Sequence, residues 1–159
     1  MPLPGLDLTD PLLSRQLWEA LGRPSALPPG LCWEQEDIPG GRVWQLRRRQ
    51  TPIAPGAIRL RAFSCAELTR MLPGQIETLE RTYCGIMIWG EGVYELRYES
   101  AYIKGDRPEP YVRKWSHIFP RPIQQPSEIL AKARMLLHLL EQAYLTPPAA
   151  LQGLSGRLQ

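Results

Sequence analysis

The alternation of apolar and polar positions along the chain predicts a series of short helices and strands, separated mostly by single prolines and glycines. A first helix is expected to begin at Asp10, whose side chain can cap it ahead of a proline, and to end before Gly22. A second helix starts at Ser64, with Glu67 three residues later completing a capping box. The longest amphipathic stripe predicts a third helix over residues 127–144.

Strands are predicted where apolar and polar residues alternate with a period of two. Residues 43–48 and 58–63 are expected to pair as a hairpin, and the proline- and glycine-rich segment 23–42 is interpreted as a loop with one short extended piece. A second hairpin is predicted from residues 83–89 and 93–99, joined by a three-residue loop, Gly90-Glu91-Gly92. Its core face is expected to combine six residues: Cys84, Ile86, Ile88, Tyr94, Leu96 and Tyr98.

Together these elements predict an α+β fold with one antiparallel sheet of four to five strands. A long C-terminal helix and two shorter helices are expected to pack on one face of that sheet. The chain has 159 residues, 43% of them hydrophobic, which suits a single core. We expect one domain over residues 1–146 and a loose tail over residues 147–159, which has little apolar surface to bury.

Several classes of protein are disfavoured by what the sequence lacks. No segment resembles a secretory signal or approaches the roughly 18 apolar residues of a membrane-spanning helix. Three widely spaced cysteines without a CxxC pair suggest neither a disulfide framework nor a zinc site. We therefore expect a soluble cytoplasmic protein that uses no metal and no cofactor.

Positive charge is concentrated in one part of the chain. The net charge is +3, yet the stretch between Ile38 and Ala66 contains no acidic residue and no lysine, so the rest of the chain is net acidic. An acidic partner would be expected to dock on this stretch. It carries six arginines: Arg42, Arg47, Arg48, Arg49, Arg59 and Arg61.

The arginines have two interpretations. If the strands at 43–48 and 58–63 pair, four arginines share one sheet face and could bind phosphate or carboxylate groups, with Trp44 as a stacking platform: Arg47, Arg49, Arg59 and Arg61. Alternatively, they form a solvated face on which they pair with nearby acidic residues: Glu34, Glu36, Asp37 or Glu67.

A second run, residues 111–119, interleaves aromatic and basic residues and looks extended. As a strand it would place four candidate partner-binding residues on one face, together with Phe119: Tyr111, Arg113, Trp115 and His117. In the alternative interpretation, Trp115 and Phe119 cover the hydrophobic core while Arg113 reaches to solvent. No nucleic-acid-binding motif accompanies the run, so sequence-specific recognition of nucleic acid is not expected.

Catalytic candidates are few. Cys65 lies in the first turn of the second predicted helix, where the helix dipole could activate a thiol. The sequence places neither His117 nor His138 near it, so an ordinary small core residue is the preferred interpretation. We therefore expect no catalytic residues and a protein that is not an enzyme.

Four features occur in a familiar order: residues 17–24 (LWEALGRP), residues 66–73 (AELTRMLP), a Trp/Tyr-rich hairpin, and a closing helix that starts PSEILA and ends LLE. In this order, which covers most of the chain, the sequence resembles small uncharacterised proteins of phages and other mobile elements. The resemblance implies a phage or prophage origin in a bacterial cytoplasm. It supplies no activity and no functional residues.

The leading functional hypothesis is a non-catalytic binding protein that engages a host component, such as a defence factor, through the arginine-rich face. A second hypothesis is a protein that sequesters an anionic nucleotide-type molecule, as a homodimer formed through Met135 and Leu139, which lie off the main apolar stripe of the last predicted helix. An enzyme of unknown class is a third. A pocket lined by these arginines would favour the second hypothesis, and a flat patch the first.

Overall fold

The structure is a computed structural model that describes residues 8–49, 59–77, 82–90, 92–103, 113–117 and 123–155. Prolines and glycines lie between most of its helices and strands. In chain order the elements are α1 (Pro11–Ala20), β1 (Gly30–Ile38), β2 (Gly41–Arg49), β3 (Arg59–Arg61), α2 (Cys65–Met71), β4 (Gln75–Glu77), β5 (Thr82–Gly90), β6 (Val93–Ile103), β7 (Arg113–His117), β8 (Ile123–Gln125), α3 (Glu128–Glu141) and α4 (Pro147–Leu154).

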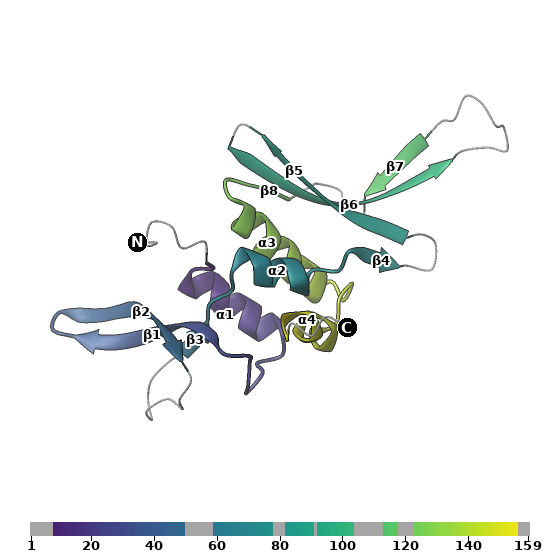
Figure 1. Ribbon diagram of the computed structural model, residues 1–159. Helices are drawn as coiled ribbons and strands as arrows, with labels where there is room; N and C mark the ends of the chain where they lie inside the picture. Colours follow the sequence, from purple (N-terminus) through teal and green to yellow (C-terminus); the bar gives the residue numbers. More distant parts are fainter. Residues whose placement is uncertain are drawn as a thin grey trace.

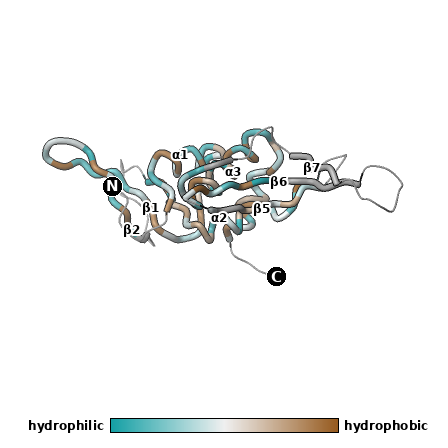
Figure 2. The backbone as a smooth tube through the Cα atoms, turned by 90° about the horizontal axis from the view of Figure 1, so that it is seen from above, coloured by the Kyte–Doolittle hydropathy of each residue, from teal (hydrophilic) through white to brown (hydrophobic). Residues whose placement is uncertain are grey.

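The predicted α+β class is confirmed, but the prediction of a single sheet is wrong. The strands form two separate antiparallel sheets, one in the order β2-β1-β3 and the other in the order β4-β5-β6-β7, with β8 also paired to β6. The helices lie between the two sheets in both views (Figures 1 and 2). Each sheet can therefore bury one face against the same helical layer.

The first sheet differs from the prediction because the segment interpreted as a loop contains its central strand. β1 pairs with β2 over nine consecutive positions and with β3 over three, so β2 and β3 are not hairpin partners. Pro39 and Gly40 make the turn between β1 and β2, with Gly40 at a φ of 98°. Frequent prolines and glycines mark the ends of β1 and had obscured the strand between them.

The second hairpin is confirmed as β5 and β6, but the β5 half of its predicted core face is wrong. Gly90 pairs with Val93, so the loop between the two strands has two residues and not the predicted three. A shift of one residue turns every side chain of a strand to the other face. Leu96 and Tyr98 are in the core as expected, and they share their face with the positions of Gly85 and Met87, whereas Cys84 is exposed.

The helix starts follow the local sequence. The Asp10 side chain accepts the amide of Leu13 at 2.7 Å and caps α1. Ser64 and Glu67 form the predicted capping box of α2, each side chain accepting the backbone amide of the other. Ser127 caps α3 through the amide of Leu130. These contacts involve residues three apart, which is why the sequence predicts them well.

The last two helices correct two predictions. Met135 and Leu139 are fully buried inside this chain, so they are not available to form a homodimer interface. Residues 147–154 of the predicted loose tail form α4, which buries Ala150 and Leu154 and packs on α2. The longest helix, α3, is therefore not the C-terminal element, and it packs against β6, β8, α1 and α2.

Tyr98 joins the second sheet to the helical layer. Its ring lies over Gly85 of the neighbouring strand, where an added Cβ would approach the ring to 3.0 Å. The side chain is buried, and its hydroxyl donates to the carbonyl of Pro73 at 2.6 Å. Burial raises the pKa of Tyr98 above its ordinary value, because the phenolate would lose its solvation.

We predict that Tyr98→Phe lowers the free energy of unfolding at neutral pH by about 1 kcal/mol, because the Pro73 carbonyl loses its donor. The raised pKa has a further consequence: the unfolded chain releases the Tyr98 proton above a pH of roughly 10, and the folded chain does not. The wild type therefore loses stability from this group as the pH rises above that value. The variant lacks this loss, so the difference between the two proteins narrows at alkaline pH.

Urea unfolding at neutral and alkaline pH measures both effects, with Tyr144→Phe, on an exposed tyrosine, as the control. A constant difference between Tyr98→Phe and the wild type across this pH range would contradict the prediction.

Candidate functional site

The predicted arginine face exists, but β1 lies in its middle. Cys32 of β1 is opposite Arg47 of β2 on one side and Arg61 of β3 on the other, and Arg59 is opposite Glu34. Directly opposed residues point to the same face of a sheet, so Arg47, Arg59 and Arg61 share one face. The sequence therefore placed these side chains on a common face, but by a strand pairing that the structure corrects.

Two other residues of the predicted site lie differently. Arg49 is opposite Gly30, a register position on the same face, but its side chain lies outside the described part of the structure. Trp44 is opposite Gln35 and so belongs to the other face of the sheet. It cannot serve as a stacking platform for a ligand held by Arg47 and Arg59, because the sheet separates them.

Charge alternates in sign across the three strands. β1 carries Glu34, Glu36 and Asp37 and no basic residue, whereas β2 and β3 carry six arginines and no acidic residue. Cross-strand ion pairs connect them. Glu34 accepts from Arg59 at 3.3 Å and lies 3.9 Å from Arg47; Arg47 also pairs with Glu36, and Arg42 with Asp37 at 2.9 Å.

Exposure divides the arginines into two groups. The side chains of Arg42 and Arg47 are 65% and 43% exposed, whereas those of Arg59 and Arg61 are 18% and 7% exposed. Ion pairs between exposed side chains contribute little to stability and exchange readily with other partners. Among the arginines of this sheet whose side chains the structure describes, Arg42 and Arg47 are therefore accessible to a macromolecule, whereas Arg59 and Arg61 belong to the interior.

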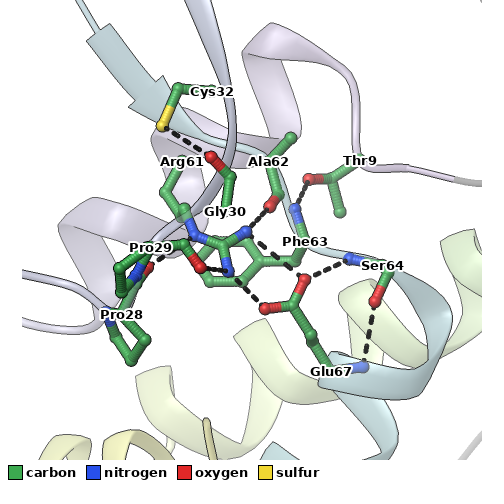
Figure 3. Close-up of polar contacts among 10 residues, drawn as sticks. All are labelled: Thr9, Pro28, Pro29, Gly30, Cys32, Arg61, Ala62, Phe63, Ser64 and Glu67. Atoms are coloured by element: carbon green, nitrogen blue, oxygen red, sulfur yellow. Dashed lines mark hydrogen bonds and ion pairs between the residues drawn. The ribbon is translucent and has the colours of Figure 1, made fainter. Parts of the chain in front are cut away.

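Arg61 is the centre of a buried network (Figure 3). Its guanidinium donates to the carbonyls of Pro28 and Pro29, to the carbonyl of Ala62, and to both carboxylate oxygens of Glu67. The five N–H groups of an arginine thus match five contacts. The guanidinium also lies 5.7 Å from the centre of the Phe63 ring, so the charge is enclosed on several sides.

Two neighbouring residues, Gly30 and Thr9, help to position the chain around this network. Gly30 has no Cβ, and an added one would overlap the Arg61 guanidinium, so glycine allows the close approach of β1. Thr9 secures the same region from the N-terminal side: its hydroxyl accepts the amide of Phe63 at 2.9 Å, and its carbonyl accepts the indole N–H of Trp33 at 2.7 Å.

We predict that Arg61→Met lowers the free energy of unfolding by about 3 kcal/mol, because it leaves the Glu67 carboxylate and several carbonyls without their donor in a buried site. Arg47→Met removes a charge of the same face at an exposed position and should cost under about 1 kcal/mol. Urea unfolding of both variants tests the difference. Equal losses would show that Arg61 has no special structural role.

A groove of about 360 Å³ lies beside this network, between the segment Pro24–Gly30 and the sheet. Trp18, Cys32, Arg59 and Arg61 contribute to its lining. Its volume is at the lower end for small-molecule sites. The two arginines in it already donate to Glu34, Glu67 and carbonyl oxygens, so an anionic ligand would have to displace an internal carboxylate. The groove is therefore a poor match for a nucleotide.

The aromatic run does not join the arginine face. Arg113, Trp115 and His117 are in β7, opposite Ile103, Ala101 and Glu99 of β6, which belongs to the second sheet. The helical layer separates this sheet from β1, β2 and β3 (Figures 1 and 2). Tyr111 and Phe119 lie outside the described residues, as do the side chains of β7. The predicted strand is present over residues 113–117, and its binding role stays a prediction.

A polar cluster that the sequence did not predict surrounds Cys65. The ammonium of Lys132 on α3 lies 3.5 Å from the Cys65 sulfur, 2.6 Å from the Thr69 hydroxyl and 2.7 Å from the carboxylate of Glu128. Burial alone lowers the pKa of Lys132, but the bond to Glu128 and the charge of Cys65 raise it overall. The hydrogen bond from Lys132 lowers the pKa of Glu128.

Cys65 and Lys132 are far apart in sequence and meet because α2 packs on α3. A cation beside a thiol stabilises the thiolate, which is the reactive form. We predict that Lys132→Met slows alkylation of Cys65 by iodoacetamide severalfold at neutral pH, since the sulfur then loses the neighbouring cation but keeps the carboxylate of Glu128 beside it.

Arg134→Met is the matched control, because it removes an exposed charge from the same helix. Mass spectrometry of the peptide that contains Cys65 separates its rate of modification from those of Cys32 and Cys84. An unchanged rate in Lys132→Met would show that the ammonium does not influence the thiol.

Among the described residues there is no group of three or more histidine, cysteine, aspartate and glutamate side chains arranged to hold a metal ion. No helix in the same part of the chain is long and apolar enough to cross a membrane. Comparisons with protein-family models, curated proteins and solved structures each found no match to this chain.

Proposed function

We propose that this protein is a non-catalytic binding protein that engages an acidic surface of a macromolecular partner through the arginines of β2. The observation that supports this best is the exposure of Arg42 and Arg47 on a hairpin that extends beyond the helical layer (Figure 1). A component of a bacterial host cell is the proposed partner. That part rests on the resemblance to phage and mobile-element proteins alone.

The shape of the hairpin suits a large partner better than a small ligand. In the part of the chain that the structure describes, β3 pairs with residues 32–34 of β1, and from residue 35 onward β1 and β2 pair only with each other. An isolated two-stranded ribbon is marginally stable in water. Ile38 at its tip is exposed, and the ribbon offers a long, narrow surface rather than a cavity. Contact with a partner would stabilise this ribbon and would explain why the chain exposes it.

The proposal predicts that replacing Arg42 and Arg47 together by glutamine reduces capture of a partner from bacterial lysate roughly fivefold or more, because each exposed charge contributes up to about 1 kcal/mol. The double variant Arg15→Gln and Arg134→Gln is the control, since it removes two exposed charges from α1 and α3. Capture by the wild type should also fall as the salt concentration rises.

Quantitative mass spectrometry of the captured proteins provides the comparison. Support comes only from a protein lost with the β2 variant and retained with the helix variant. If both double variants capture the same proteins in the same amounts, the arginines of β2 do not form the binding surface.

A further inference from the structure

We infer that the partner contributes an extended acidic segment that pairs with the outer edge of β2 as an additional strand of the first sheet. This inference rests on the proposed function and names the mode of binding at the same site. Strand addition of this kind uses main-chain hydrogen bonds for affinity and side chains for selectivity.

The first argument is the position of β2. In the described part of the chain β2 is the outermost strand of its sheet, with β1 on its inner side. It is nine residues long and pairs with β1 without a bulge. No proline interrupts it. Proteins usually protect such edges by shortening, bulges, prolines or charged side chains, and of these devices β2 has only the charged side chains.

The second argument identifies the backbone groups that a new strand would meet. The amide of Ala62 donates to the carbonyl of Leu31, so the backbone of Leu31 faces β3 and not β2. Hydrogen-bonded and non-hydrogen-bonded pairs alternate in an antiparallel ladder. The residue opposite Leu31, and every second residue from it along β2, therefore directs its backbone groups outward. These residues are Arg42, Trp44, Leu46 and Arg48.

The third argument is charge. Within the sheet the acidic strand β1 lies between the basic strands β2 and β3. An acidic strand on the outer edge of β2 would continue this alternation, at the strand spacing of about 4.8 Å. A second copy of β2 would instead place arginines beside arginines, which is unfavourable. Charge complementarity therefore selects an acidic segment and disfavours self-pairing.

The test uses the full chain and a synthetic nonapeptide in which glutamate alternates with threonine and valine. Two control peptides carry lysine in place of glutamate, or keep the glutamates and replace the other residues by proline so that no strand can form. Amide hydrogen exchange by NMR is measured with and without each peptide. We expect the amides of Arg42, Trp44, Leu46 and Arg48 to become protected, while those of Val43, Gln45 and Arg47, which face β1, change little.

A backbone variant tests the same hydrogen bonds. Trp44→Pro removes one outward-facing N–H and should weaken binding of the acidic peptide roughly fivefold, whereas the control Trp44→Thr keeps the N–H and should bind the peptide within about twofold of the wild type. Arg42→Pro compared with Arg42→Gln repeats the test at a second position. Unchanged amide exchange of β1 in the absence of peptide confirms that each proline variant retains the sheet.

Binding of both acidic peptides, without alternating protection, would overturn strand addition and leave the charge-based proposed function standing. If the acidic nonapeptide does not bind, the inference is also overturned. The proposed function would then be tested only by the capture experiment with the two glutamine double variants. Protection in the presence of the lysine peptide would contradict the acidic chemistry. Alternating protection with the acidic strand-forming peptide alone supports the inference.

Discussion

The contact between Arg61 and Glu67 is the constraint on which the arrangement of the first half of the chain depends. Arg61 is on β3, Glu67 is on α2, and the carbonyls of Pro28 and Pro29 belong to the segment before β1. A guanidinium that is only 7% exposed needs partners for all its donors. Satisfying them brings three segments together, and this fixes the first sheet against the helical layer.

Glu67 has two roles in this contact, and they depend on each other. Its carboxylate accepts the backbone amide of Ser64 at 3.1 Å and closes the capping box of α2, while it also binds Arg61. The helix cap therefore holds the carboxylate in an orientation in which it can bind the arginine. This pre-organisation reduces the side-chain entropy that forming the ion pair would otherwise cost.

The sequence predicted the features that depend on neighbouring residues and missed those that depend on distant ones. The caps at Asp10, Ser64 and Ser127 follow from residues three apart. β1 was missed because prolines and glycines mark both of its ends and because its second partner, β3, lies beyond β2 in the chain. Loop length also matters: one residue fewer between β5 and β6 reversed the predicted face of β5, whereas Leu96 and Tyr98 of β6 lie in the core as predicted.

The candidate site shows the same limit. Alternation along β2 and β3 correctly put Arg47, Arg59 and Arg61 on one face, because register parity survives the insertion of β1 between them. The sequence also named the acidic residues that pair with them. It could not divide the arginines by exposure, since burial of Arg61 depends on the segment around Pro28 and on α2.

The arginines of β2 can have two effects: they protect the edge strand against self-association, and they select a partner strand of opposite charge. Arginines on an edge strand repel a second copy of the same strand, and so they prevent the self-association to which a long regular edge is prone. The same arginines lower the cost of pairing with a strand of opposite charge. β1 demonstrates this within the chain, because Glu34 and Glu36 face the arginines of β2 from the inner side. An edge that is protected by charge alone excludes copies of itself but stays open to an acidic strand, whereas a proline or a bulge would close it to both.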